Sequence, residues 1–340
     1  MPPSILKAPT RLNIKPEERT SSSSKIAVLR LGAFFLLLLG MIVATDAMIQ
    51  LGMRRIKTSA FGASNQLFTG EVNSEIIISG SSRALTHYDP QIITQITGRS
   101  CFNLGRNGSQ TDMQLAYLKA YLAHNTAPKI IIHNLDSFSF LTSKEIYDPA
   151  QYFPYLWDRH IYEGVRRVYP KSAWKMRYVP LYAYAIEDLR FTWTVGLRAL
   201  VGLQPRETLF RGYEERHLTW TGDFSSFRSA HPEGVRFEIE DQGVRDLTEL
   251  VTLCKERGIQ LLLVYSPVYR EMQKLEKNAD EIHGEFSRIA LAGGATLLDF
   301  RNSPICDDQS LFYNSQHLNV SGAKRFSQEI SEILQSHGTR

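Results

Sequence analysis

Two runs of three isoleucines, at residues 76–78 and 130–132, constrain the fold most. Short β-branched runs of this kind are typical of strands that are buried on both faces of a parallel sheet. Helical spacing follows at residues 110–124, and two further apolar runs predict strands at 259–266 and 295–300. Strands that alternate with helices form parallel sheets with right-handed crossovers. The sequence therefore predicts an α/β fold.

A serine and a histidine occupy positions where a parallel α/β sheet usually has its functional site. A Gly-Ser-Ser turn at residues 80–82 ends the first isoleucine run, and His317 precedes the predicted last helix, residues 321–335, with Ser321 as its N-cap. Doubly wound sheets collect distant residues at the carboxyl ends of their strands. Ser82 is therefore the candidate nucleophile and His317 its candidate base. The alternatives are a plain turn and a core histidine.

The order of these residues resembles the SGNH (GDSL-type) hydrolase superfamily over most of residues 74–335. That family has a Ser after the first strand, a Gly after the second, an Asn after the third and an Asp-x-x-His block before the last helix. The matching residues here are Ser82, Gly105, Asn134 and His317. The resemblance implies a three-layer α/β/α, flavodoxin-like fold. It also implies an oxyanion hole made by the backbone N–H groups of Ser82 and Gly105 and the Asn134 amide. A turn glycine and a strand-end cap are the alternative roles of Gly105 and Asn134.

One position departs from the family pattern. Asn314 stands three residues before His317, where the family has Asp. A triad carboxylate fixes the histidine tautomer and stabilises the imidazolium, and its change to Asn costs a serine protease about 10⁴ in turnover. The Asn314 amide oxygen could still orient the ring, or Asp307 or Asp308 could supply the carboxylate. We therefore expect a slow or specialised enzyme, or a protein that has kept the fold and lost the chemistry.

The amino-terminal region predicts a membrane anchor. Residues 31–53 are almost wholly apolar, with Asp46 as the one charged residue, and their 23 positions exceed the ~20 needed to cross a bilayer. Residues 1–30 hold six basic and two acidic residues and are expected to form a disordered tail. Because more cations precede the run than follow it, the positive-inside rule favours a cytoplasmic N-terminus and an extracytoplasmic, periplasmic domain over 54–340. A cleaved signal peptide and a buried core helix are the alternatives.

An aromatic-rich segment interrupts the strand–helix alternation at residues 140–235. It holds all four tryptophans and nine of the fifteen tyrosines of the chain. We expect a mostly helical insertion. It could be a lid with its own small aromatic core, an acyl or glycan pocket, or a docking face for a membrane partner.

Charge and composition exclude several classes of partner. Residues after the tail hold 33 basic and 33 acidic residues, which is not the charge of a nucleic-acid-binding protein. Three cysteines without a Cys-x-x-Cys pair, and nine histidines without zinc-like spacing, predict no metal site. No Gly-x-Gly-x-x-Gly follows a strand, so we expect no dinucleotide and no other cofactor.

The branch of the family that the chain looks most similar to is membrane-anchored. That branch includes the lipoteichoic-acid D-alanylation protein and the alginate acetylation proteins, which help to move acyl groups onto envelope polymers. The resemblance implies an inner-membrane acyl esterase or O-acyltransferase that acts on a cell-envelope exopolysaccharide or lipid-linked glycan. The alternative is a catalytically degenerate SGNH-fold scaffold for a polytopic membrane acyltransferase.

Overall fold

A computed structural model describes residues 20–186, 189–206 and 209–337. The chain divides into two compact units, residues 1–45 and residues 46–340. Much of the predicted basic tail, residues 1–19, lies outside the described residues.

Five parallel strands form the central sheet of the second unit, in the order β2-β1-β3-β6-β7. Their bounds are β1 Ile76–Ser79, β2 Cys101–Asn103, β3 Ile130–Leu135, β6 Gln260–Tyr265 and β7 Thr296–Asp299. The two isoleucine runs lie in register, with Ile77 beside Ile131. Numbered along the sheet's own strands, the order is 2-1-3-4-5, which is flavodoxin-like and confirms the predicted α/β class. The winding reverses between β1 and β3, and folds of this kind bind ligands outside the strand ends at that point.

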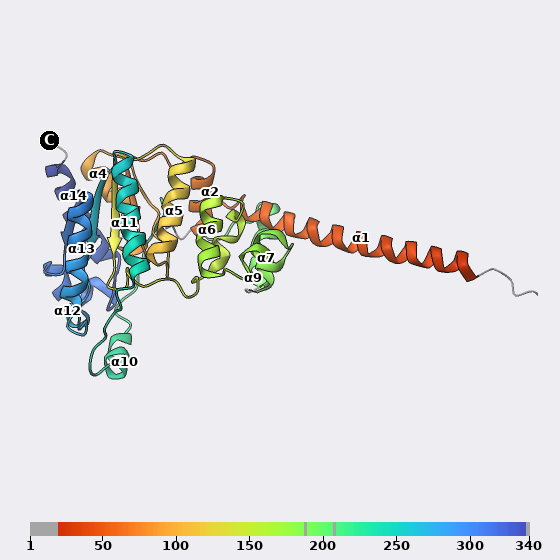
Figure 1. Ribbon diagram of the computed structural model, residues 1–340. Helices are drawn as coiled ribbons and strands as arrows, with labels where there is room; N and C mark the ends of the chain where they lie inside the picture. The colour runs from red at the N-terminus through yellow and green to blue at the C-terminus, as the bar shows by residue number, and fades with distance from the viewer. Residues whose placement is uncertain (1–19, 187–188, 207–208, 338–340) are drawn as a thin grey trace, which may run out of the picture. The chain divides into compact units, whose positions relative to one another are not determined.

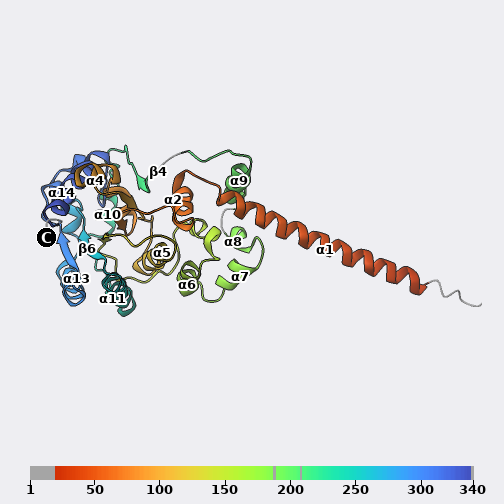
Figure 2. The same cartoon turned by 90° about the horizontal axis from the view of Figure 1, so that it is seen from above.

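Helices cover both faces of this sheet, as Figure 2 shows with β6 between the two layers. One layer consists of α3 Ser82–His87, α4 Pro90–Thr97 and α14 Val320–His337, and the other of α5 Thr111–His124, α11 Asp241–Glu256 and α13 Ala279–Gly293. Alternate strand residues enter the two cores, so Ile77 faces α5 and α11 while Ile76 and Ile78 face α4 and α14. The predicted three-layer arrangement is confirmed.

The insertion occupies the chain between β3 and α11 and is mostly helical, as predicted (Figure 1). Its elements are η1 Pro149–Gln151, η2 Phe153–Tyr155, α6 Arg159–Val168, α7 Ala173–Tyr178, α8 Tyr182–Ala185, α9 Leu189–Leu200, β4 Leu209–Phe210, β5 Tyr213–Glu214 and α10 Asp223–Ala230. Phe153, Tyr155 and Tyr184 belong to the same core as α5 and the sheet. The idea of a separate aromatic core is therefore wrong, because the aromatic side chains extend the main core instead.

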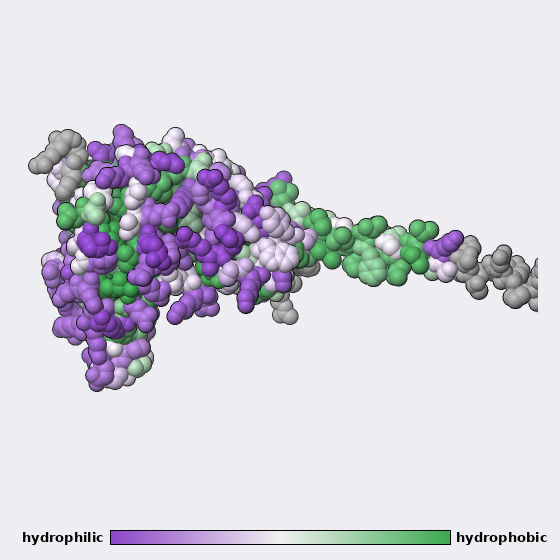
Figure 3. All heavy atoms as spheres, viewed as in Figure 1, coloured by the Kyte–Doolittle hydropathy of each residue, from purple (hydrophilic) through white to green (hydrophobic). Residues whose placement is uncertain are grey.

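A long apolar helix, α1, runs from Thr20 to Met53 and begins earlier than the predicted residue 31. The stretch Ser24–Met53 is long and apolar enough to cross a membrane, by length and composition. Within the first unit its apolar side chains are exposed, for example Val28 at 69% and Leu36 at 72% (Figure 3). Exposed apolar surface of this extent is typical of a membrane anchor or a signal sequence.

The last turns of α1, residues 46–53, belong to the second unit. Gly52 meets α9 so closely that a Cβ there would lie 1.8 Å from the Gly196 carbonyl oxygen. Asp46 accepts a hydrogen bond of 2.9 Å from the backbone N–H of Leu181. The second compact unit thus begins inside the helix, at residue 46.

The start of α14 differs from the sequence expectation. The Asn319 side-chain oxygen accepts hydrogen bonds of 3.1 Å from the backbone N–H groups of Ser321 and Gly322, and so caps the helix. The predicted cap, Ser321, is wrong. The helix begins at Val320, one residue before the predicted start at 321. The Val320 N–H is engaged by a tertiary contact, because it donates to the Arg216 carbonyl.

All three cysteines, Cys101, Cys254 and Cys306, are buried free thiols. Burial raises the pKa of each thiol. Among the described residues, no group of three or more His, Cys, Asp or Glu could hold a metal ion.

Candidate active site

The turn after β1 places Ser82 as the first residue of α3. Gly80 has φ of +141°, a backbone conformation that side chains rarely tolerate, and this allows the sharp turn from strand to helix. Ser81 caps the helix by accepting the Arg83 N–H at 3.2 Å. The Ser82 hydroxyl therefore points from the carboxyl end of β1, and no described hydrogen bond engages its backbone N–H.

Ser82 and His317 are brought together although they lie 235 residues apart. The Ser82 Oγ is 2.8 Å from His317 Nε2, and His317 Nδ1 is 2.9 Å from Asn314 Oδ1. Asn314 Oδ1 also accepts the backbone N–H groups of Gln316 and His317, at 3.0 and 2.9 Å. Because a backbone N–H can only donate, this atom must be the amide oxygen. Nδ1 therefore carries the proton, and Nε2 accepts from Ser82 as a general base requires.

The two aspartates upstream have other partners. Asp307, in η3 (Pro304–Asp307), forms an ion pair of 2.8 Å with Arg270 at the start of α12 (Arg270–Gln273). Asp308 caps η4 (Gln309–Leu311) by accepting the Ser310 N–H at 3.0 Å. Orientation by Asn314 is thus the alternative that the structure supports.

The electrostatic surroundings of His317 disfavour its charged form. Burial, followed by the positive charges of Arg83 and Arg216, lowers its pKa to about 3. No ion pair joins His317 to a carboxylate within the described chain. The ring is therefore neutral and ready to accept a proton at physiological pH, but the imidazolium that forms is poorly stabilised.

Arg83 and Asp136 form a buried ion pair next to the turn that carries Ser82. Arg83 is 2% exposed, and its guanidinium lies 3.2 Å from the Asp136 carboxylate and 4.6 Å from the centre of the Tyr265 ring. It also donates to the backbone carbonyl of Ser266. A paired, buried arginine of this kind fixes α3 against the ends of β3 and β6.

His87 connects the buried residues around Arg83 to the strand that carries His317. The His87 Nε2 accepts the Leu318 N–H at 3.1 Å, so its Nδ1 must carry the proton and donate to Ser266 Oγ at 2.9 Å. Leu318 belongs to β9 (His317–Leu318), which pairs with β8 (Phe312–Asn314). His87 is therefore a positioning residue for His317. The sequence did not indicate this role of His87. The residues around His87 do not show that its ring will accept the N–H of Leu318, 231 residues later.

Gly105 lies against the back of α3. A Cβ at this position would lie 2.4 Å from the Leu85 backbone nitrogen and 2.8 Å from the Ala84 carbonyl carbon. Its N–H donates to Asn103 Oδ1 at 2.8 Å. Gly105 therefore serves close packing rather than a positive φ, and its N–H is engaged instead of facing the site as an oxyanion donor would.

The Asn134 side-chain amide lies beside the turn at Gly80, but other groups engage it. Asn134 is fully buried, and its Oδ1 accepts the Tyr88 hydroxyl at 2.8 Å. Its Nδ2 donates to the Leu135 carbonyl at 3.1 Å. Of the three expected oxyanion donors, only the Ser82 N–H is free in the described contacts.

The close approach of Gly105 gives a prediction for stability. Gly105→Ala should push α3 and Ser82 away from the β2 loop and lower the free energy of unfolding by about 1–3 kcal/mol, the usual cost of overpacking. Denaturant unfolding of the purified protein measures this. Gly284→Ala is the matched control, because a Cβ in the middle of α13 meets nothing within 4 Å and should raise helix stability by up to ~1 kcal/mol. Equal effects of the two changes would contradict the packing role.

No family model matches the sequence, and no curated protein is similar to it. Several solved structures are similar in fold. A protein assigned to the SGNH hydrolases from Slackia heliotrinireducens is 12% identical, with a TM-score of 0.40, over 77% of this chain and 99% of its own. A GDSL-like lipase from Bacteroides thetaiotaomicron is 8% identical, with a TM-score of 0.37, over 77% and 88%. A family two carbohydrate esterase from Clostridium thermocellum, in complex with cellohexaose, is 8% identical, with a TM-score of 0.33, over 77% and 63%. Likeness at this level says nothing of chemistry, which is inferred below from the contacts of the site itself.

Proposed function

We propose that the protein is a membrane-anchored serine acyl esterase or O-acyltransferase of the SGNH type. The observation that carries the proposal is the chain of contacts from Ser82 through His317 to Asn314, with the tautomer fixed for proton abstraction. Serine, base and orienting group in this geometry are the elements of nucleophilic acyl transfer.

The reaction follows from these contacts. The Ser82 oxygen attacks the carbonyl carbon of an ester, and its proton passes to His317 Nε2. The Ser82 N–H, at the start of α3, donates to the oxyanion that develops. His317 then returns the proton to the departing alcohol and leaves an acyl-Ser82. Water completes an esterase cycle, and a second alcohol completes a transferase cycle.

The substrate and location belong to the same proposal. We place the second unit outside the cytoplasm, where it would act on a cell-envelope polysaccharide or a lipid-linked glycan. The long apolar stretch of α1 and the surplus of cations before it support the membrane location. The resemblance of the Ser82 and His317 blocks to envelope acylation proteins supports the substrate class.

A scaffold function has specific observations in its favour. Among the described residues the base has no carboxylate partner, and the Gly105 N–H and the Asn134 Nδ2 donate to other groups. Under this alternative the fold would hold a polytopic acyltransferase or its polymer without turning over an ester.

A fluorophosphonate probe tests the enzyme proposal directly. An activated serine forms a covalent phosphonyl ester with it, whereas an ordinary hydroxyl does not. The full chain in detergent should be labelled, and peptide mass spectrometry should find the adduct at Ser82. A folded protein that stays unlabelled after prolonged exposure would favour the scaffold.

The proposed orientation can be tested with introduced cysteines, because all three native thiols are buried. Ser226→Cys, on the exposed surface of α10, should react with a membrane-impermeant maleimide in intact spheroplasts. Ser24→Cys, at the other end of the apolar stretch, should react only after the membrane is permeabilised. The reverse pattern would contradict the orientation, and the parent protein is the control for background labelling.

A further inference from the structure

Large apolar side chains are exposed together on one part of the insertion. Among the described residues of 54–337, eleven large apolar side chains are exposed, and six of them lie within residues 171–206: Trp174, Tyr178, Val179, Ile186, Val201 and Leu203. We call these six residues the insertion face. Single exposed apolar residues are ordinary on a protein surface, but such a concentration is typical of a surface that binds a partner.

The insertion face belongs to elements that other contacts hold in place. Helix α7 buries Met176 in the core and exposes Trp174 and Tyr178, which are four residues apart and therefore lie on one side of the helix. The segment after α9 is fixed as well, since the Gln204 side-chain oxygen accepts the Lys57 N–H at 2.8 Å. The apolar side chains are therefore presented by an ordered surface.

The insertion face lies at the end of the second unit where the last turns of α1 enter it. Helices α7 and α9 lie beside these turns in both views (Figures 1 and 2). Gly196 of α9 packs against Gly52, and the Leu181 N–H, just before α8, donates to the Asp46 carboxylate. The insertion therefore takes the same depth in a membrane as the last turns of α1.

The length of the apolar run sets this depth. Arg30 is the last charged residue before it, and the ~20 residues that cross the hydrocarbon core of about 30 Å end near residue 50. Residues 46–53 thus lie at the far boundary of the hydrocarbon, and Arg54 and Arg55 follow directly. The insertion face is then at the level of the lipid headgroups.

Cations accompany these apolar residues. Residues 171–206 contain six basic and two acidic residues, and the two acidic ones, Glu187 and Asp188, lie outside the described residues. The Lys175 ammonium lies 5.7 Å from the centre of the Trp174 ring. Tryptophan and tyrosine beside lysine and arginine are the composition of a surface that meets a membrane with anionic lipids.

A groove beside the insertion face carries further cations. Arg54, Arg55 and Lys57 line it next to Leu200 at the end of α9, and Glu71 is the carboxylate among its lining residues. Three cations against one carboxylate make the groove positive, which suits the phosphate of a lipid headgroup.

We propose that the insertion face docks on the surface of the bilayer that α1 spans. Its aromatic and aliphatic side chains lie among the lipid headgroups, and the neighbouring cations bind anionic phospholipids. The inference rests on the membrane location in the proposed function and not on its chemistry. It gives the insertion the role of a second membrane contact, which fixes the height and tilt of the domain over the bilayer.

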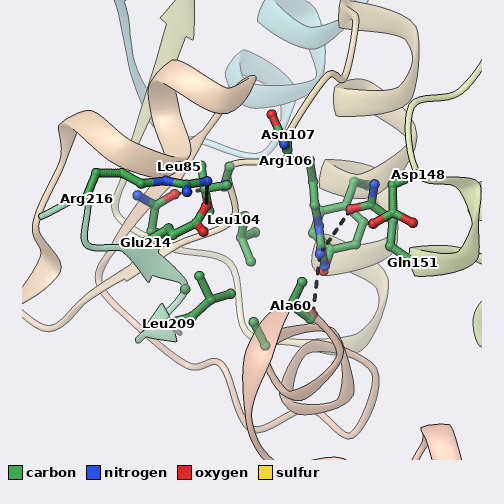
Figure 4. Close-up of a pocket in the computed structure, with 15 residues that line it drawn as sticks. Ala60, Leu85, Leu104, Arg106, Asn107, Asp148, Gln151, Leu209, Glu214 and Arg216 are labelled. Carbon is green, nitrogen blue, oxygen red and sulfur yellow. Dashed lines mark hydrogen bonds and ion pairs between the residues drawn. The ribbon is translucent and has the colours of Figure 1, made fainter. Parts of the chain in front are cut away.

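Docking has a consequence for the substrate. Helix α2 (Ser59–Phe68) lines the groove with Gln66 and lines a cavity of about 170 Å³ with Ala60 (Figure 4). Leu85 of α3, the helix that begins with Ser82, lies in the wall of the same cavity. The docking surface and the surroundings of α3 thus lie on two sides of one helix. Of the two substrate classes proposed above, docking favours the lipid-linked glycan.

Contact with lipid can be measured without turnover, so that failure of this inference and failure of the proposed chemistry are distinguishable. The full chain, with the other three tryptophans changed to Phe, reports from Trp174, which is 51% exposed. It is reconstituted in vesicles of equal parts phosphatidylcholine and phosphatidylglycerol, with or without bromine at the headgroup end of the phosphatidylcholine chains. We expect the bromine to lower Trp174 emission about twofold or more, because an interfacial tryptophan lies at that depth.

A matched reporter controls for the tether that α1 provides. The variant that lacks all four native tryptophans and carries Leu291→Trp reports from an exposed position of α13. Helix α13 lies at the other end of the second unit in both views (Figures 1 and 2). The emission of this reporter should be the same with and without bromine.

Charge variants test the headgroup contacts. Lys171→Glu with Arg198→Glu, both at exposed positions, should weaken the quenching of Trp174 about twofold or more. Lys255→Glu with Arg257→Glu, the same change of charge at exposed positions at the end of α11, should leave it unchanged. Equal quenching of both reporters, or quenching that persists in the first charge variant, would overturn the proposal. A folded protein whose Trp174 is not quenched would overturn it too, and would indicate that a membrane protein covers the face.

Discussion

Ser82→Ala and His317→Ala are each expected to reduce hydrolysis of 4-nitrophenyl acetate by the purified protein to the uncatalysed background. The two side chains share one hydrogen bond of 2.8 Å and act as a unit, so the double variant should be no slower than either single variant. Steady-state rates with active-site titration measure this. Ser226→Ala and His231→Ala, which change residues outside the site, are the controls and should keep full activity.

Additive losses would show that the two groups act separately. Full activity in either single variant would place the reaction elsewhere in the molecule. Either result would contradict the proposed nucleophile and base.

Asn314→Asp is expected to raise the rate at which Ser82 is acylated, by at least about tenfold and by no more than the ~10⁴ that the reverse change costs a serine protease. The loop should keep its shape, because a carboxylate oxygen can accept the same three N–H groups as the Asn314 oxygen. The gain comes from the new negative charge, which stabilises the His317 imidazolium against the positive charges of Arg83 and Arg216.

The pH dependence of acylation provides a second measurement. The base must be neutral, and a pKa of about 3 keeps His317 neutral from pH 5 to pH 8, so the parent rate should not fall across that range on account of this group. A carboxylate at position 314 raises the pKa of His317 and should move the acidic limb of the profile to higher pH. Gln309→Glu, an exposed position in the same loop, is the control for charge alone. An unchanged rate and profile in Asn314→Asp would contradict the orienting role of Asn314.

The sequence was sufficient to predict four of the five strands of the sheet, all but β2, and the central pair of the site. The isoleucine runs and the turn after residue 79 are local patterns in the sequence. The structure has β1, β3 and the start of α3 at the positions that these patterns predict. The meeting of Ser82 with His317 follows from the rule that strand ends collect distant residues, which is independent of local detail.

What could not be predicted depends on tertiary contacts between residues far apart in the chain. The Asn134 amide faces inward because Tyr88, 46 residues earlier, offers it a buried hydroxyl. From the sequence, Gly105 is interpreted as a turn residue, because the sequence does not show that α3 packs directly against it. The last turns of α1 look like membrane-spanning helix, but the Gly196 backbone and the Leu181 N–H include them in the domain. Local sequence pattern and residue propensity do not show which distant residues will make these contacts.

The three buried thiols have a consequence for how the chain is made. Cys101 lies in the edge strand β2, Cys254 in α11 and Cys306 in η3, so each is shielded only after distant parts of the fold have come together. Parallel strands joined by long crossovers form such contacts slowly. In an oxidising compartment, the interval between translocation and core closure would be the time when wrong disulfides can form. We therefore expect the yield of native protein, rather than its final stability, to depend on the cell's disulfide-reducing enzymes.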